Sequence, residues 1–122
     1  MSAYFKFHQT SPEGELKAFV FRLDDERKIT EARAILKNPA SIKGHVQGTI
    51  VSSPAPYNPG WSFHLDPASI GFFEFQMEVC DSNVTYVEKH LDEIGGSFLP
   101  NSFWCPWSSK LAAEVYESGA PC

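Results

Sequence analysis

The chain has 122 residues, of which 43% are hydrophobic and 20% charged, and its formal net charge is −5 at pH 7. This length and composition predict one soluble globular domain with a core of its own. The acidic excess argues against nucleic acid as a partner, because little in the chain would neutralise phosphates. No apolar run approaches the roughly 20 residues that a membrane-spanning helix needs.

The N-terminal part predicts a β-hairpin. Phe5 and Phe7 alternate with Lys6 and His8, which is the pattern of a half-buried strand. Turn-forming residues follow, and the stretch 16–23 is apolar on both faces, so we expect a central strand there.

A helix and a third strand are expected next. Asp24 or Asp25 can cap a helix that runs to about Asn38, where the following proline ends it. The stretch 42–51 predicts a strand, and Gly48 within it allows a close approach of another chain segment.

The stretches 61–66 and 72–79 alternate apolar and polar residues on either side of a turn. We expect them to pair as an antiparallel hairpin, with Leu65 opposite Phe73 and His64 opposite Glu74. One apolar face then enters the core. Its members are Trp61, Phe63, Leu65, Phe73, Phe75, Met77 and Val79.

The C-terminal third predicts two further helices. Asp81 and Ser82 can cap the first, whose apolar face ends at a pair of glycines near residue 95. Ser108 or Ser109 can start a short helix through Tyr116. Residues 118–122 are expected to form a flexible tail. The fold class is therefore α+β, a single compact domain over residues 1–117 with a mainly antiparallel sheet, two main helices and a short C-terminal helix.

Two of the three cysteines could form a crosslink. A disulfide between Cys80 and Cys105 would close a loop of about 25 residues and contribute roughly 3 kcal/mol. The alternative is two buried thiols. Cys122 is expected to be free. The N-terminal residues lack the apolar stretch of a signal peptide, so the residues leave the compartment open.

One polar cluster offers a catalytic or metal-binding alternative. His45, His64, Asp66 and Glu74 could share a sheet face, where imidazoles and carboxylates bind divalent metals or transfer protons. Their spacing matches no established signature. A solvated face with a cross-strand pair is the simpler interpretation, in which case no cofactor is expected.

The loop before residue 61 is the expected interaction surface. Its three prolines restrict the backbone and lower the cost of ordering on binding, and Tyr57 is a residue type that often dominates binding energy. We expect a protein or glycan partner there, including the active cleft of a protease if the domain is an inhibitor. The predicted binding residues are Pro54, Pro56, Tyr57, Asn58, Pro59 and Trp61.

Three motifs resemble a known family. They are Pro54-Ala55-Pro56-Tyr57-Asn58-Pro59-Gly60-Trp61-Ser62-Phe63-His64-Leu65-Asp66-Pro67, then Glu78-Val79-Cys80-Asp81, and Trp104-Cys105-Pro106-Trp107-Ser108-Ser109. They are similar to the small domains known as calmodulin-binding protein N-terminal domains, and the similarity covers nearly the whole chain. The resemblance implies that Cys80 and Cys105 are paired and that the location is extracellular. It carries over no catalytic residue.

The residues themselves do not predict calmodulin binding. A calmodulin target is a basic amphipathic helix, whereas four basic residues of the first expected helix are balanced by four acidic ones and the second helix is acidic. We therefore expect a non-catalytic recognition domain. The alternative is a metal-dependent or acid–base enzyme that uses the histidine and carboxylate cluster.

Overall fold

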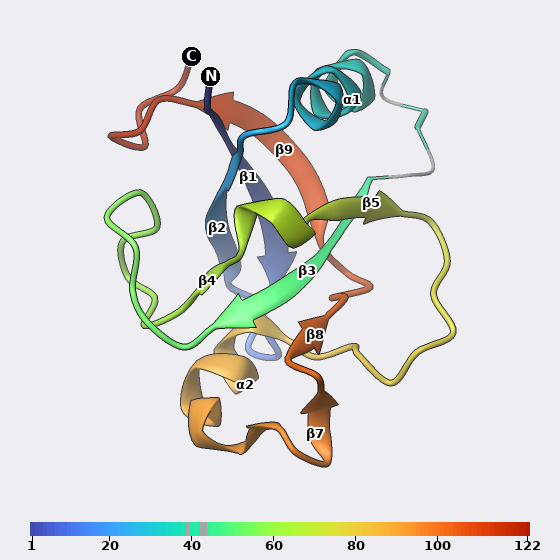
Figure 1. Cartoon of the computed structure of the whole chain (residues 1–122), viewed down its shortest axis with the longest axis vertical. Coiled ribbons are helices and arrows are strands. Elements are labelled where there is room, and N and C mark those ends of the chain that lie inside the picture. The colour runs from blue at the N-terminus through green and yellow to red at the C-terminus, as the bar shows by residue number, and fades with distance from the viewer. Residues whose placement is uncertain (39, 42–43) are drawn as a thin grey trace.

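The computed structural model describes residues 1–38, 40–41 and 44–122. It is an α+β domain in which antiparallel strands predominate. In Figure 1 one long strand, β3 (His45–Val51), crosses in front of a three-stranded sheet, while α1 and α2 lie at opposite ends of the molecule. The expected fold class is confirmed.

The three-stranded sheet joins the two ends of the chain. It has the order β2-β1-β9, built from β1 (Ala3–Thr10), β2 (Leu16–Leu23) and β9 (Lys110–Val115), all antiparallel. The predicted hairpin of β1 and β2 is confirmed. The central strand is β1, however, and β2 is an edge strand.

The predicted C-terminal helix is wrong, because that segment is β9. Leu111 and Val115 are four residues apart, which is a helical spacing, but β9 carries an irregularity where β1 passes from Lys6 to Phe7. The register shift puts Leu111 in the main core and Val115 in a second cluster on the other face. A bulge in a strand therefore produced the same spacing as a helix. The last residues, 118–122, turn back along β9.

The predicted hairpin of residues 61–79 is also wrong. Its two halves, β4 (His64–Leu65) and β5 (Gly71–Phe73), each pair with β3 and not with one another. A 3-10 turn, η1 (Pro67–Ser69), separates them, and Asp66 caps this turn with its side chain. A fourth strand, β8 (Phe103–Trp104), also pairs with β3. The long apolar β3 thus replaces the expected partner of both halves.

The close approach predicted at Gly48 of β3 is found. A Cβ at this position would lie 3.3 Å from a side-chain carbon of Ile70 and 3.4 Å from Leu65. The beginning of the expected third strand, residues 42–43, lies outside the described residues.

Both main helices are present. The first, α1 (Glu26–Lys37), begins after Asp25, whose side chain accepts a hydrogen bond from the backbone of Arg27. The second, α2 (Val84–Lys89), is capped by Asn83 and not by the predicted Asp81 or Ser82. It continues as η2 (Leu91–Glu93) into the short parallel pair β6 (Ile94–Gly95) and β7 (Phe98–Pro100). None of the helices among the described residues is long and apolar enough to cross a bilayer.

The core between the sheets is aromatic. The indole ring of Trp104 is fully buried, and its ring centroid lies 5.5 to 5.8 Å from those of Phe7, Phe19 and Phe63. Edge-on arrangements of this kind add to the stabilisation from burial. The core therefore fixes β3, β4 and β8 against the first sheet.

Candidate functional site

The proline loop, residues 54–61, folds onto the edge strand β2. Tyr57 is only 6% exposed and packs with Ala55, Val20 and Val115. Its ring centroid lies 5.3 Å from that of Tyr4. Burial raises the pKa of the Tyr57 phenol above its ordinary value. The residue that was expected to face a partner therefore faces the sheet.

Two side chains of the loop region satisfy the free edge of β2. The side-chain oxygen of Asn58 accepts a hydrogen bond of 2.8 Å from the backbone N–H of Val20, and its amide donates to the carbonyl of Phe63. The indole N–H of Trp61 donates to the carbonyl of Ala18 at 2.8 Å. An unpaired strand edge is a template for aggregation, so these contacts give the loop a structural role.

The exposed part of the proline loop is formed by its prolines. Pro54, Pro56 and Pro59 are exposed, whereas Tyr57 and Asn58 are buried. Of the six predicted binding residues, the three prolines and the half-buried Trp61 remain accessible. This leaves a smooth surface with few groups that could fix the orientation of a ligand.

The four residues of the alternative metal site are separated. His45 starts β3, whereas His64 pairs with Val51 at the other end of that strand, about 20 Å away at the usual rise per residue. The Nδ1 atom of His64 lies 2.7 Å from the carbonyl oxygen of Ser53, and Asp66 caps η1. Among residues 1–38, 40–41 and 44–122 no group of three or more His, Cys, Asp or Glu side chains could hold a metal ion.

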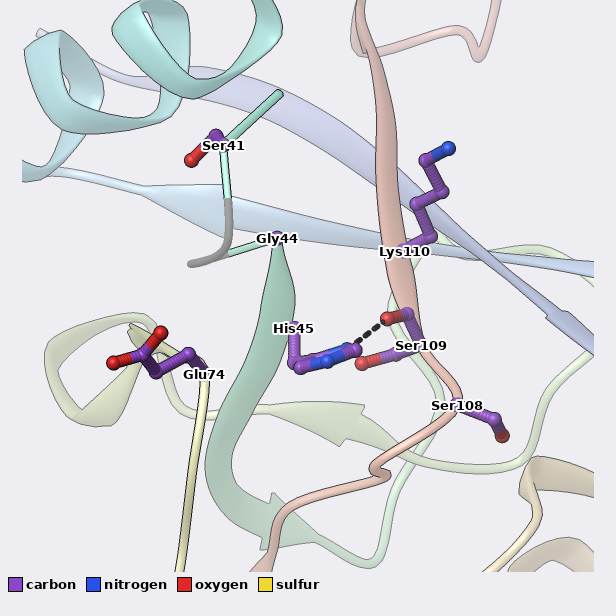
Figure 2. A pocket seen from close by; sticks show the side chains of 7 residues that line it. All are labelled: Ser41, Gly44, His45, Glu74, Ser108, Ser109 and Lys110. Carbon is purple, nitrogen blue, oxygen red and sulfur yellow. Dashed lines mark hydrogen bonds between the residues drawn. The ribbon is translucent and has the colours of Figure 1, made fainter. Parts of the chain in front are cut away.

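His45 and Glu74 do line a common hollow of about 490 Å³ beside the start of β3. In Figure 2 the carboxylate of Glu74 points away from the imidazole, and the side chain of Lys110 also points away from it. The Nδ1 atom of His45 lies 2.7 Å from the carbonyl oxygen of Ser109. Because a carbonyl only accepts, we assign the hydrogen to Nδ1.

Neither serine beside His45 is arranged as a nucleophile. The buried Ser109 hydroxyl donates to the carbonyl of Pro106 at 2.6 Å and accepts from the backbone N–H of Val46 at 3.0 Å. The Ser108 hydroxyl accepts from the side chain of Gln9. A nucleophilic serine needs a base that accepts its proton, and no such contact is present between these groups. The hollow therefore holds polar atoms without a catalytic arrangement.

A different surface stands out beyond β5. We call Phe75, Met77 and Val79 the apolar strip; they are 64%, 83% and 83% exposed. They lie on the connection that runs from β5 to α2 along the outside of the molecule (Figure 1). Three large side chains exposed to this extent form an apolar patch on the order of a few hundred Å², a size that often marks an interaction site.

The apolar strip is held at both ends. Its last residue precedes Cys80, which forms a disulfide with Cys105, and the backbone N–H of Cys105 donates to the carbonyl of Cys80 at 2.8 Å. The ring of Trp107 contacts Phe75 with a centroid distance of 5.6 Å. The disulfide that the family resemblance implies is thus confirmed, and it anchors the strip to β8.

The strip also lies in the acidic part of the chain. Residues 71–109 contain six carboxylates and one lysine, a net charge of −5 that equals the net charge of the whole chain. The remaining residues are balanced. The six carboxylates are Glu74, Glu78, Asp81, Glu88, Asp92 and Glu93.

The sequence pattern alone misses the apolar strip. Its alternation predicts a buried strand face, because exposed and buried apolar faces have the same period of two. Two signals would have raised the question: the carboxylates interleaved with it and the cysteine that follows. Neither fits the middle of a core strand.

Comparison with known proteins supports the family expected from the motifs. No curated protein and no solved structure matches the chain significantly. A family model for the N-terminal domain of a calmodulin-binding protein matches residues 1–118, a range that includes every helix and strand described above. The chain therefore belongs to this family of calmodulin-binding protein N-terminal domains.

Proposed function

We propose that this chain is a non-catalytic recognition domain that binds another protein through the apolar strip. The observation that carries the proposal is the exposure of three side chains at alternate positions, Phe75, Met77 and Val79, in a chain that buries most of its other large apolar residues. Exposed apolar area of this kind lowers solubility unless a partner covers it.

The anchoring of the strip supports the same proposal. A disulfide at Cys80 and the ring of Trp107 restrict the strip before it meets a partner. Restriction of this kind lowers the conformational entropy lost on binding. Flexible methionine and rigid aromatic side chains together are common at protein interfaces.

The proline loop is a weaker choice for the same function. Its aromatic residue Tyr57 and its amide Asn58 already contact the protein itself. A protease inhibitor needs a loop whose side chains enter the protease, and the loop's outward side chains are prolines. We therefore assign recognition to the apolar strip and edge protection to the proline loop.

Photo-crosslinking tests the proposal directly. A photoreactive amino acid replaces Met77 in one version of the protein and Leu16 in a matched control, which is also a large apolar residue and is 65% exposed. We expect a discrete adduct with one protein from position 77 and none from position 16. Val79→Ser should remove the adduct while changing the free energy of unfolding by less than about 0.5 kcal/mol.

Two results would contradict the proposal. One is the same set of adducts from positions 77 and 16, which would mean that crosslinking follows exposure alone. The other is an adduct at position 77 that Val79→Ser leaves unchanged.

A further inference from the structure

We infer that the segment which occupies the apolar strip is a cationic polypeptide, with Lys or Arg placed next to large apolar side chains. This inference rests on the proposed function and specifies the chemistry of the partner. Its basis is the distribution of charge around the strip. Glu74 and Glu78 alternate with the strip residues, and Asp81 follows Cys80.

Carboxylates elsewhere in the chain are neutralised by nearby bases. Within residues 1–38 and 44–122, five of them form ion pairs with Lys or Arg, and the closest contact joins Arg33 and Glu114 at 2.8 Å. The other four pairs are Lys17 with Glu15, Arg22 with Asp24, Arg27 with Asp25, and Lys28 with Glu31.

The carboxylates beside the strip differ. Glu74 and Glu78 are exposed, and within the described part of the chain neither forms an ion pair. Asp81 accepts a hydrogen bond from the backbone N–H of Trp107, and it forms no ion pair with a basic residue of the same described part. The apolar strip therefore lies within a local field of unneutralised negative charge.

This field selects among the possible occupants. Lys and Arg side chains gain charge-assisted hydrogen bonds with Glu74 and Glu78 while neighbouring apolar residues cover the strip. A second copy of the chain would bring the same acidic segment against itself, and an anionic lipid surface would be repelled. The charge of the surface thus favours one occupant, a basic and apolar segment of another protein.

Three synthetic peptides of equal length test the inference. Each has twelve residues in which Val, Phe and Leu alternate with Lys in the first peptide, Ser in the second and Glu in the third. Binding is measured by fluorescence anisotropy at 50 mM and 300 mM salt. We expect the lysine peptide to bind at least tenfold more tightly than the serine peptide at low salt, and the glutamate peptide not to bind.

Charge variants locate the effect. The double variant Glu74→Gln/Glu78→Gln should weaken binding of the lysine peptide about fivefold and remove most of its salt dependence. The matched control Asp92→Asn/Glu93→Gln removes two carboxylates of the same acidic segment, but on η2. It should change the affinity less than twofold.

The outcomes separate this inference from the proposed function. Equal affinity for the lysine and serine peptides, or an unchanged affinity in Glu74→Gln/Glu78→Gln, would overturn the cationic partner. So would a dimer in analytical ultracentrifugation that Val79→Ser dissociates, or binding to vesicles of anionic lipid. A specific crosslink at position 77 together with no peptide binding would overturn the inference and leave the recognition function standing. Loss of both results would remove the two together.

Discussion

Two apolar segments, the proline loop at residues 54–61 and the apolar strip at Phe75, Met77 and Val79, have opposite relations to the core. Both are rich in large side chains, and they are separated in the chain by only β4, η1 and β5. Tyr57 in the loop is 6% exposed, whereas Met77 in the strip is 83% exposed.

The difference follows from what each segment meets. The proline loop reaches the free edge of β2, where the N–H of Val20 and the carbonyl of Ala18 need partners, and Asn58 and Trp61 supply them. The apolar strip follows the last pairing of β5 with β3, which ends at Phe73. Composition alone therefore does not separate a contact surface from a structural plug. The available hydrogen bonds do.

The largest expected effect compares one aromatic residue from each segment. Tyr57→Ala should lower the free energy of unfolding by about 3 kcal/mol, because a buried ring is lost and a cavity remains. Phe75→Ala should lower it by less than about 1 kcal/mol, because only the edge contact with Trp107 is lost. Chemical denaturation of both variants measures the two changes. The reverse order would mean that the loop is the free surface and the strip is the structural one.

A smaller effect is expected from the hydrogen bonds of the proline loop. Asn58→Ala leaves the buried N–H of Val20 and the carbonyl of Phe63 without their partner. We expect a loss of about 2 kcal/mol, which corresponds to roughly 8 °C in Tm for a domain of this size. The control Pro56→Ala changes an exposed residue of the same loop and should stay within about 0.5 kcal/mol. Equal Tm values for the two variants would show that Asn58 does not hold the loop.

Local patterns predict the first hairpin and the first helix well. Phe5 and Phe7 alternate with polar residues in β1, and Asp25 caps α1, so each element depends mainly on its own residues. The close approach at Gly48 is also a local property, because only glycine lacks the Cβ that would meet Ile70.

The wrong predictions have a different origin, because they depend on which segment becomes the partner. Leu65 and Phe73 can pair with one another in a consistent register, yet both pair with β3, which offers a longer apolar strand. Leu111 and Val115 have helical spacing, yet β1 takes them into a sheet through a bulge. Tertiary pairing decides both cases, and periodicity does not record it.

The candidate site depends on the same limitation. The alternation of Phe75, Met77 and Val79 predicts a buried face only if a partner strand covers it, and the expected partner, residues 61–65, lies elsewhere. The buried position of Tyr57 follows from its contact with β2, which is 34 residues or more distant in the chain. The choice of six loop residues as a binding surface therefore followed composition, while the exposed strip was assigned to the core.

The smallest expected effect tests the burial of Tyr57 by pH. Burial raises the pKa of its phenol above the ordinary value of 10.0, so the folded protein favours the neutral form. The resulting stability is fully present below pH 10 and is lost as the pH rises through the raised pKa. Between pH 8 and pH 11 the denaturation midpoint of the unmodified protein should therefore fall more than that of Tyr57→Phe, by less than about 1 kcal/mol. Tyr116→Phe, at a residue that is 60% exposed, should fall as far as the unmodified protein. If Tyr57→Phe does so as well, the phenol ionises as easily in the folded chain as in the unfolded one, and the loop is not closed over β2.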